Sequence, residues 1–167
     1  TIIEKNVVIG NNCSIGSNTI IRNTLIKNNI KILDNCIIGK HGFGFFPKHS
    51  KNLRYPHMGI VIIEDDCEIG CGSTIDRGSM SNTFIGKNTY LDNQIHIAHN
   101  VRILDNCVIG KHGFGFFPKD NRNLRYPHMG IVLIEDDCEI GCGSTIDRGS
   151  MSNTTIGKNT YLDNQIH

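Results

Sequence analysis

Aliphatic residues recur every six positions along most of this chain. Residues 9–14 read IGNNCS and residues 15–20 read IGSNTI. Each unit opens on an aliphatic residue, continues with polar residues or Gly, and carries a small residue four positions after the aliphatic one. A helical period of 3.6 residues does not fit this spacing. The pattern predicts short strands with inward aliphatic side chains, joined by tight turns at the Gly and Asn positions.

Six-residue units of this kind are typical of a parallel β-helix. The sequence therefore predicts an all-β solenoid of about seven coils that forms one domain over residues 1–167. The aliphatic openers expected to point inward are Ile3, Ile9, Ile15, Ile21, Ile26, Ile32, Ile63, Ile69, Ile75, Ile85, Leu91, Ile97, Ile103 and Ile109. The small inward positions include Cys13, Cys36, Cys67, Cys107 and Cys138, for which we expect a reduced packing role.

A much longer repeat overlies the short one. Residues 32–96 and 103–167 align without a gap at an offset of 71, and only six of the 65 positions differ, three of them at 49–51 against 120–122. We interpret each period as nine six-residue units plus insertions at 44–56 and 81–84, with 115–127 as the copy of the longer loop. Nine units make three whole coils. The interpretation predicts that the second copy repeats the first in phase, on the same faces.

Composition narrows the class of protein. The net charge of +1 gives no electrostatic case for nucleic acid or a membrane surface. No signal peptide and no apolar run near 18 residues is apparent, so we expect neither secretion nor membrane insertion. Seven cysteines, an odd number, favour reduced thiols over a disulfide framework. These features together predict a cytoplasmic protein.

Four motifs occur in a specific order: HGFGF at 41–45, TIDRG at 74–78, DNQ at 92–94 and IAHN at 97–100. In this combination the chain resembles the UDP-3-O-(3-hydroxyacyl)glucosamine N-acyltransferases of lipid A biosynthesis. The resemblance implies a left-handed β-helix with three units per coil, which assembles as a homotrimer. It also implies transfer of a 3-hydroxyacyl group from acyl carrier protein to the 2-amino group of a UDP-glucosamine derivative, without a cofactor.

The resemblance implies a catalytic role for His99, the histidine of the IAHN motif. A protonated amine must lose a proton before it attacks a thioester, and neutral imidazole suits that task near pH 7. We expect substrate contacts from Asp92, Asn93, His96, Phe43 and Phe45. Asp92 and Asn93 occur one unit before the histidines, and we expect them to be near enough to orient a histidine or to contact substrate.

Two features of the candidate site have competing interpretations. His96 and His99 have a spacing that occurs in zinc sites, but no third ligand with suitable spacing appears, so we expect no metal. The loop 44–56 and its copy 115–127 carry aromatic and basic residues. They are either flaps over the acyl or nucleotide cleft or surface loops with solvated charges, and the sequence leaves both open.

The duplication also suggests a loss of function. We expect a shortened form of the family, without its N-terminal uridine-binding domain and C-terminal helices, and therefore catalytically incomplete. The in-phase interpretation predicts that loop 115–127 crowds the surface beside His99. Two alternatives remain: an engineered duplicated β-solenoid scaffold without activity, and a hexapeptide acetyltransferase that uses acetyl-CoA.

Overall fold

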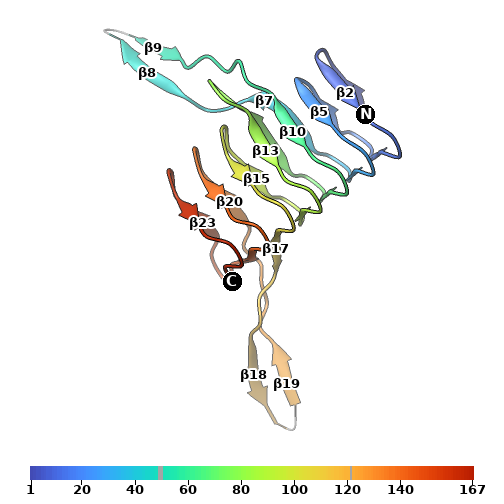
Figure 1. Cartoon of the computed structure of the whole chain (residues 1–167). Helices are drawn as coiled ribbons and strands as arrows, with labels where there is room; N and C mark the ends of the chain where they lie inside the picture. The colour runs from blue at the N-terminus through green and yellow to red at the C-terminus, as the bar shows by residue number, and fades with distance from the viewer. Residues whose placement is uncertain (49–50, 121) are drawn as a thin grey trace.

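The chain folds into a left-handed parallel β-helix of about seven coils, seen along its side in Figure 1. The structure is a computed structural model that describes residues 1–48, 51–120 and 122–167. Three parallel sheets form the sides of a triangular prism, and the chain visits them in a constant order. The predicted fold class is confirmed. Residues 49–50 and 121, where part of the difference between the copies lies, fall outside the described residues.

Each side of the prism is one sheet. Sheet A contains β1 (Ile2–Ile3), β4 (Ile20–Ile21), β7 (Ile37–His41), β12 (Thr74–Arg77), β15 (His96–Ile97), β20 (Val132–Ile134) and β23 (Thr154–Ile156). Sheet B contains β2 (Val7–Ile9), β5 (Thr24–Ile26), β10 (Val61–Ile63), β13 (Thr83–Ile85), β16 (Arg102–Ile103), β21 (Glu139–Ile140) and β24 (Tyr161–Leu162). Sheet C contains β3 (Ser14–Ile15), β6 (Lys31–Ile32), β11 (Glu68–Ile69), β14 (Tyr90–Leu91), β17 (Val108–His112) and β22 (Thr145–Arg148).

Two antiparallel hairpins project from this prism (Figure 1). The first hairpin pairs β8 (Phe45–Lys48) with β9 (Lys51–Arg54), and the second pairs β18 (Phe116–Lys119) with β19 (Arg122–Arg125). The first leaves the corner where the chain passes from sheet A to sheet B, which we call the AB corner. The second leaves the CA corner, where the chain passes from sheet C to sheet A.

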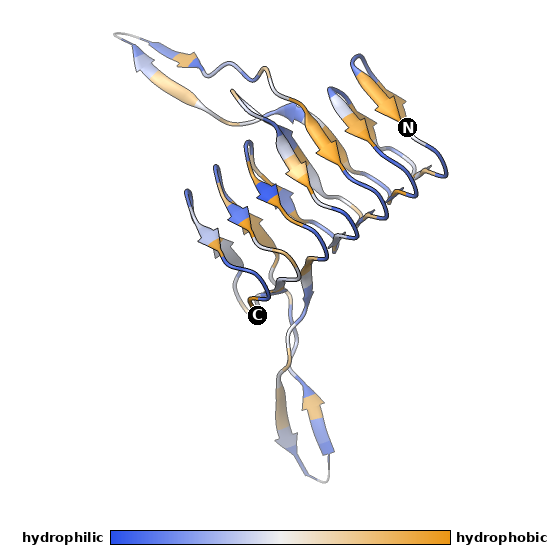
Figure 2. Cartoon of the chain, viewed as in Figure 1, coloured by the Kyte–Doolittle hydropathy of each residue, from blue (hydrophilic) through white to orange (hydrophobic). Residues whose placement is uncertain are grey.

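The aliphatic openers fill the interior of the prism. They pair with one another from coil to coil, as in the ladder Ile26, Ile63, Ile85 and Ile103 of sheet B. These side chains are at most 1% exposed. Figure 2 shows the alternation between apolar strand segments and hydrophilic turns. Ile3 and Ile9, in the first described coil, are 47% and 38% exposed because their strands pair on one side only, with the coil that follows.

Asparagine residues turn the corners. Asn6, Asn12, Asn18, Asn29 and Asn35 adopt φ values between 55° and 62°, a left-handed conformation that Asn tolerates better than most residues. Their side chains also bond along the stack: Asn12 Nδ2 donates to Asn29 Oδ1 over 3.3 Å, and Asn29 Nδ2 donates to Asp66 Oδ1 over 2.9 Å. The six-residue spacing of Asn therefore sets the spacing of the corners.

The predicted inward cysteines pack inside the corners. Cys36, Cys67, Cys107 and Cys138 are buried and Cys13 is partly buried, and all seven cysteines are free. Cys67 Sγ lies 3.1 Å from the Gly86 carbonyl oxygen, and burial raises the pKa of its thiol to about 11. A thiol with so little thiolate is a packing group rather than a nucleophile or metal ligand.

The prediction that the two copies are in phase is wrong. β6 lies in sheet C, but its copy β16 lies in sheet B. β7 lies in sheet A and its copy β17 in sheet C, while β10 lies in sheet B and its copy β20 in sheet A. Every strand of the second copy is therefore rotated by one face relative to the first.

The long loop accounts for the difference. Nine units in one period require a six-residue unit that starts at His57, directly after the insertion 44–56. The chain instead leaves sheet A after His41 and resumes in sheet B at Val61, so residues 42–60 contribute no step around the prism. One period then makes eight steps, from β6 in sheet C to β16 in sheet B, which is one step short of three coils.

None of the described residues forms a helix long and apolar enough to cross a membrane.

Candidate functional site

His99 lies at the AB corner, in the turn between β15 and β16. Ile97 points into the core and is fully buried, while Asn100 adopts a φ of 63° and turns the chain. Asn100 Oδ1 accepts a hydrogen bond of 2.7 Å from the Ser79 backbone N–H, and its Nδ2 donates to Asp137 Oδ1 over 2.9 Å. The turn that carries His99 is thus tied to the coils before and after it.

His57, which follows the first hairpin in the sequence, lies at the same corner as His99. The ring centroids of His57 and His99 are 5.0 Å apart in an edge-to-face arrangement. His57 is 4% exposed, and its Nδ1 lies 2.9 Å from the Tyr55 carbonyl oxygen. Burial, and then the nearby His99, lower the pKa of His57. A neutral His57 that donates from Nδ1 satisfies this geometry.

Gly42 allows the two histidines to meet. A Cβ atom at this position would lie 2.8 Å from His57 Nε2, 2.8 Å from His99 Cδ2 and 3.2 Å from Asp76 Oδ2. Contacts below 3.0 Å would force the rings apart. The first glycine of the HGFGF motif is therefore required because side chains approach it closely. Its φ does not require a glycine, because it is not in the left-handed region.

A cavity of 570 Å³ opens beside His99. One wall comes from the first hairpin and contains Phe43, Phe45 and Tyr55, while the other contains polar residues of later coils. Phe43 and Phe45 stack edge to face at 5.1 Å, and Phe43 remains 83% exposed. The structure thus brings three predicted site residues together: His99, Phe43 and Phe45.

The second copy supplies part of the polar wall. Asp136, in the turn between β20 and β21, puts its Oδ1 atom 3.4 Å from Nε2 of His99. Lys158 Nζ lies 2.7 Å from the other carboxylate oxygen of Asp136. Nδ1 of His99 is buried and has no hydrogen-bond partner within the part of the chain that the structure describes. Among the described residues, a carboxylate oxygen therefore lies beside Nε2 of His99, and no partner lies beside Nδ1.

His96 belongs to a neighbouring polar group on sheet A. Its Nδ1 lies 2.7 Å from Thr74 Oγ1 and its Nε2 lies 4.0 Å from Asp76 Oδ2. Asp76 is 2% exposed and forms a short ion pair with Lys40. Burial lowers the pKa of His96, with Asp76 opposing that effect. His96 is therefore partly exposed, at 37%, on the outer side of sheet A, and its contact with substrate stays a prediction.

Asp92 and Asn93 lie elsewhere. They occupy the CA corner after β14, where Asp92 Oδ2 accepts a hydrogen bond of 2.9 Å from Arg148 and Asn93 Oδ1 accepts one of 2.8 Å from the Cys71 N–H. Both line a separate cavity of 300 Å³ on sheet C. His99 lies at the next corner, on the other side of sheet A, and no bond between it and either side chain occurs among the described residues. Their contact with a histidine or with substrate stays a prediction.

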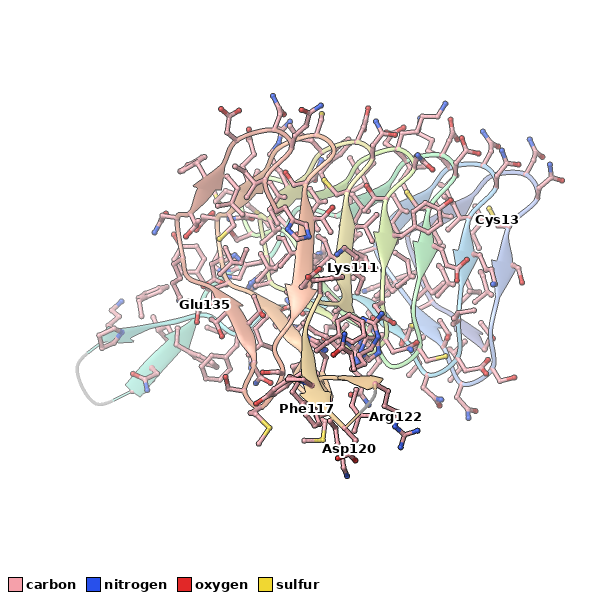
Figure 3. All side chains as sticks on the ribbon, turned by 90° about the horizontal axis from the view of Figure 1, so that it is seen from below. Cys13, Lys111, Phe117, Asp120, Arg122 and Glu135 are labelled. Atoms are coloured by element: carbon pink, nitrogen blue, oxygen red, sulfur yellow. The ribbon has the colours of Figure 1, made fainter. Side chains whose placement is uncertain are left out.

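The expectation that the second loop crowds His99 is also wrong. The second hairpin leaves the CA corner (Figure 1). Figure 3 looks onto this hairpin, which carries Phe117, Asp120 and Arg122, and shows Lys111 on the strand that leads to it. At the base of this hairpin, Lys111 Nζ lies 2.6 Å from Asp147 Oδ1, which repeats the ion pair between Lys40 and Asp76 in the first copy. The sequence contains no second copy of His99.

Three further residues lie near His99: Asp76, which belongs to the TIDRG motif, and His57 and Asp136, which no motif indicated. The count of nine units places His57 at the start of a six-residue unit. Pro56, directly before it, instead indicates a loop. Asp136 could not be found, because its place depends on the rotation of the second copy. Among the described residues, no group of three or more His, Cys, Asp or Glu side chains could hold a metal ion.

Comparison with known proteins relates this geometry to an enzyme class. Over 99 residues, or 59% of this chain, the sequence is 43% identical to the UDP-3-O-acylglucosamine N-acyltransferase of Bradyrhizobium diazoefficiens. It is 46% identical over 100 residues to the enzyme of that name from Rhodopseudomonas palustris. Each match covers 28% of the relative's length. No protein-family model matches.

A solved structure extends the comparison to the fold. The UDP-N-acetylglucosamine acyltransferase from Campylobacter jejuni aligns with 96% of this chain and 52% of its own, with a TM-score of 0.68 and 20% identity. At that identity the match concerns the fold alone. Over about three fifths of its length the chain is thus similar in sequence to UDP-3-O-acylglucosamine N-acyltransferases, and it shares the fold of the solved acyltransferase.

Proposed function

We propose that this chain, a relative of the UDP-3-O-acylglucosamine N-acyltransferases, carries an N-acyltransferase site at the AB corner. The reaction would move a 3-hydroxyacyl group from acyl carrier protein to the 2-amino group of a UDP-glucosamine derivative. The observation that carries the proposal is the 570 Å³ cavity between His99 and the aromatic wall of the first hairpin. This cavity has a candidate base on one side and an apolar surface on the other, and it lies in a chain that is similar in sequence to N-acyltransferases.

His99 would act as general base. The attacking amine loses a proton to the imidazole as nitrogen forms a bond to the thioester carbonyl carbon, and the carrier thiolate leaves. Only a nitrogen whose lone pair faces the cavity can accept that proton. We assign this role to Nε2, because it lies 3.9 Å from where a Cβ atom would stand on Gly44, a residue that lines the cavity. A base of this type contributes about 10²–10⁴ in rate.

Phe43, Phe45 and His96 would contact substrate. The two phenylalanines offer an apolar surface next to the base, which suits an acyl chain. His96 lies on sheet A, partly exposed, and would meet polar groups of the sugar. Asp92 and Asn93 would contact substrate only at the CA corner, in the cavity on sheet C.

The assembly and location follow the same proposal. We propose a homotrimer in the cytoplasm that receives its acyl group from acyl carrier protein. Seven free cysteines fit a reducing compartment. We further propose that this form is catalytically incomplete, because the coils after His99 are the rotated second copy rather than coils dedicated to the acyl chain.

Acyl transfer with radiolabelled UDP-glucosamine substrate and 3-hydroxyacyl carrier protein tests the proposal. We expect slow turnover, well below that of the Bradyrhizobium diazoefficiens relative, that His99→Gln abolishes. His128→Gln, at the base of the second hairpin, is the matched control and should keep the activity. Turnover that survives His99→Gln would overturn the role of His99, and turnover equal to that of the relative would overturn the incompleteness.

One alternative is supported by a specific observation. Only six of 65 positions differ between the copies, although the rotation gives the two copies different neighbours. Such identity in unlike surroundings favours a duplicated scaffold that was not shaped by activity. Calorimetric titration with the UDP-sugar separates the two: heat of binding supports the enzyme, and its absence in a folded chain supports the scaffold.

A further inference from the structure

The rotation of the second copy changes the surroundings of His99. In the first copy, Asp65 occupies the turn between β10 and β11, at the corner between sheets B and C, where its Oδ1 accepts a hydrogen bond of 2.8 Å from the Asn28 N–H. Its copy Asp136 occupies the AB corner instead, 3.4 Å from Nε2 of His99. The same residue has a structural role in one copy and contacts the candidate base in the other.

We propose that Asp136 holds a proton on Nε2 of His99 and thereby removes the lone pair that faces the cavity. Asp136 would be a positioning residue that selects the tautomer of the candidate base. In the selected tautomer, Nε2 carries a proton and therefore cannot accept one from the substrate.

Two independent observations carry this proposal. The carboxylate of Asp136 attracts a proton to the nearer nitrogen, Nε2, and both side chains are largely buried, at 12% and 17% exposed, so solvent screens the attraction little. The other nitrogen, Nδ1, is buried without an acceptor among the described residues. A proton on Nδ1 would leave a buried donor unpaired, which is unfavourable. Both effects favour the tautomer with Nε2–H.

The remaining charged and titratable groups around His99 determine how strong this effect is. Lys158, from the turn between β23 and β24, pairs with the second oxygen of Asp136 over 2.7 Å and weakens its pull on the imidazole. Asp137 is engaged with Asn100 over 2.9 Å. His57 approaches ring to ring from the first hairpin and does not supply an acceptor to Nδ1. Asp76 also lies near the ring but is paired with Lys40. Asp136 is therefore the carboxylate in direct contact with Nε2.

The consequence for catalysis rests on the proposed function. A general base must present an unprotonated nitrogen to the substrate ammonium. With Nε2 protonated and Nδ1 directed into the protein, His99 presents a donor to the cavity instead. The second copy would thus inhibit the site of the first.

Nitrogen-15 NMR of the imidazole rings tests the proposal without any assay of activity. His99→Gln identifies the His99 signals in the uniformly labelled chain, and spectra are recorded above pH 8, where imidazole is neutral. The wild-type chain should show a protonated Nε2. Asp136→Ala should change the ratio of the two tautomers toward Nδ1–H by about tenfold, the effect of losing one charge-assisted contact. Asp65→Ala, the identical residue of the first copy, should leave the ratio unchanged.

Lys158→Gln adds a variant that acts in the opposite direction. Loss of the ammonium should strengthen the hold of Asp136 and increase the Nε2–H population further, which a purely structural effect would not do. An unchanged tautomer ratio in Asp136→Ala, or an Nδ1–H tautomer in the wild-type chain, would overturn the proposal. Acyl transfer by Asp136→Ala is measured separately: if the tautomer changes and no turnover appears, the proposed function fails while the tautomer assignment stands.

Discussion

At the residue scale, the position of each side chain within its six-residue unit decides its environment. The opener points into the prism, and the Asn that precedes the next strand turns the corner. This division was predictable, because burial of an aliphatic side chain and the tolerance of Asn for positive φ are local properties. The openers predicted from sequence are buried throughout the middle of the prism, including Ile63, Ile69 and Ile75 at 0% exposure.

Truncation of an inward opener should therefore be costly. Ile85 is fully buried in sheet B, whereas Ile9, at the same inward position of the first coil, is 38% exposed. Ile85→Ala should lower the free energy of unfolding by about 2–5 kcal/mol, and Ile9→Ala by about 1 kcal/mol or less. Urea denaturation measures both. Equal losses in the two variants would contradict a single continuous core.

At the element scale, the first hairpin is more than a solvated surface loop. It carries Phe43 and Phe45 to the cavity and returns through His57 to the ring of His99. The sequence left a flap and a surface loop open as interpretations. It could not decide between them, because the contact of His57 with His99 joins residues 42 positions apart, and no local pattern records such a contact.

The burial of His57 predicts a pH dependence of stability. Burial, then His99, lower its pKa below the ordinary value of about 6.5. The unfolded chain then binds more protons than the folded chain, so this contribution to stability is complete above pH 6.5 and is lost as the pH falls from there through the folded pKa. His57→Gln should flatten the dependence between pH 7 and 5 by at most about 1.4 kcal/mol per pH unit.

Urea midpoints across that pH range measure the effect. His41 and His96, whose pKa values are also lowered by burial, remain in the variant and should keep part of the slope. A slope that stays unchanged or steepens in His57→Gln would contradict the assignment of a neutral, buried His57.

At the scale of the whole molecule, the rotation between the copies decides which residues meet. Eight steps per period direct the two hairpins to different corners and bring Asp136 to His99. Nine steps would have aligned the hairpins on one corner, about 14 Å apart along the prism at 4.8 Å per layer. Identical sequences therefore acquire different neighbours, as Asp65 and Asp136 do.

Lysine cross-linking distinguishes the two arrangements. Hairpins that reach about 20 Å from different corners should hold Lys48 and Lys119 about 35 Å or more apart, beyond a short bifunctional reagent. Lys48 and Lys51 pair across the first hairpin and serve as the positive control. Mixed isotope labelling separates links within one chain from links between chains. A link between Lys48 and Lys119 within one chain would contradict the rotation.

The sequence by itself determined the strand period, the inward openers, the corner residues and the relation to N-acyltransferases, because all of these are written in local spacing and in motifs. It did not determine the phase of the duplication. That depended on whether residues 42–60 add a step around the prism, which is a property of where the chain leaves and rejoins the sheets. Only the tertiary structure decided this, and with it the partner of His99 and the separation of Asp92 from the site. A single step around a threefold prism moves every later side chain to another face.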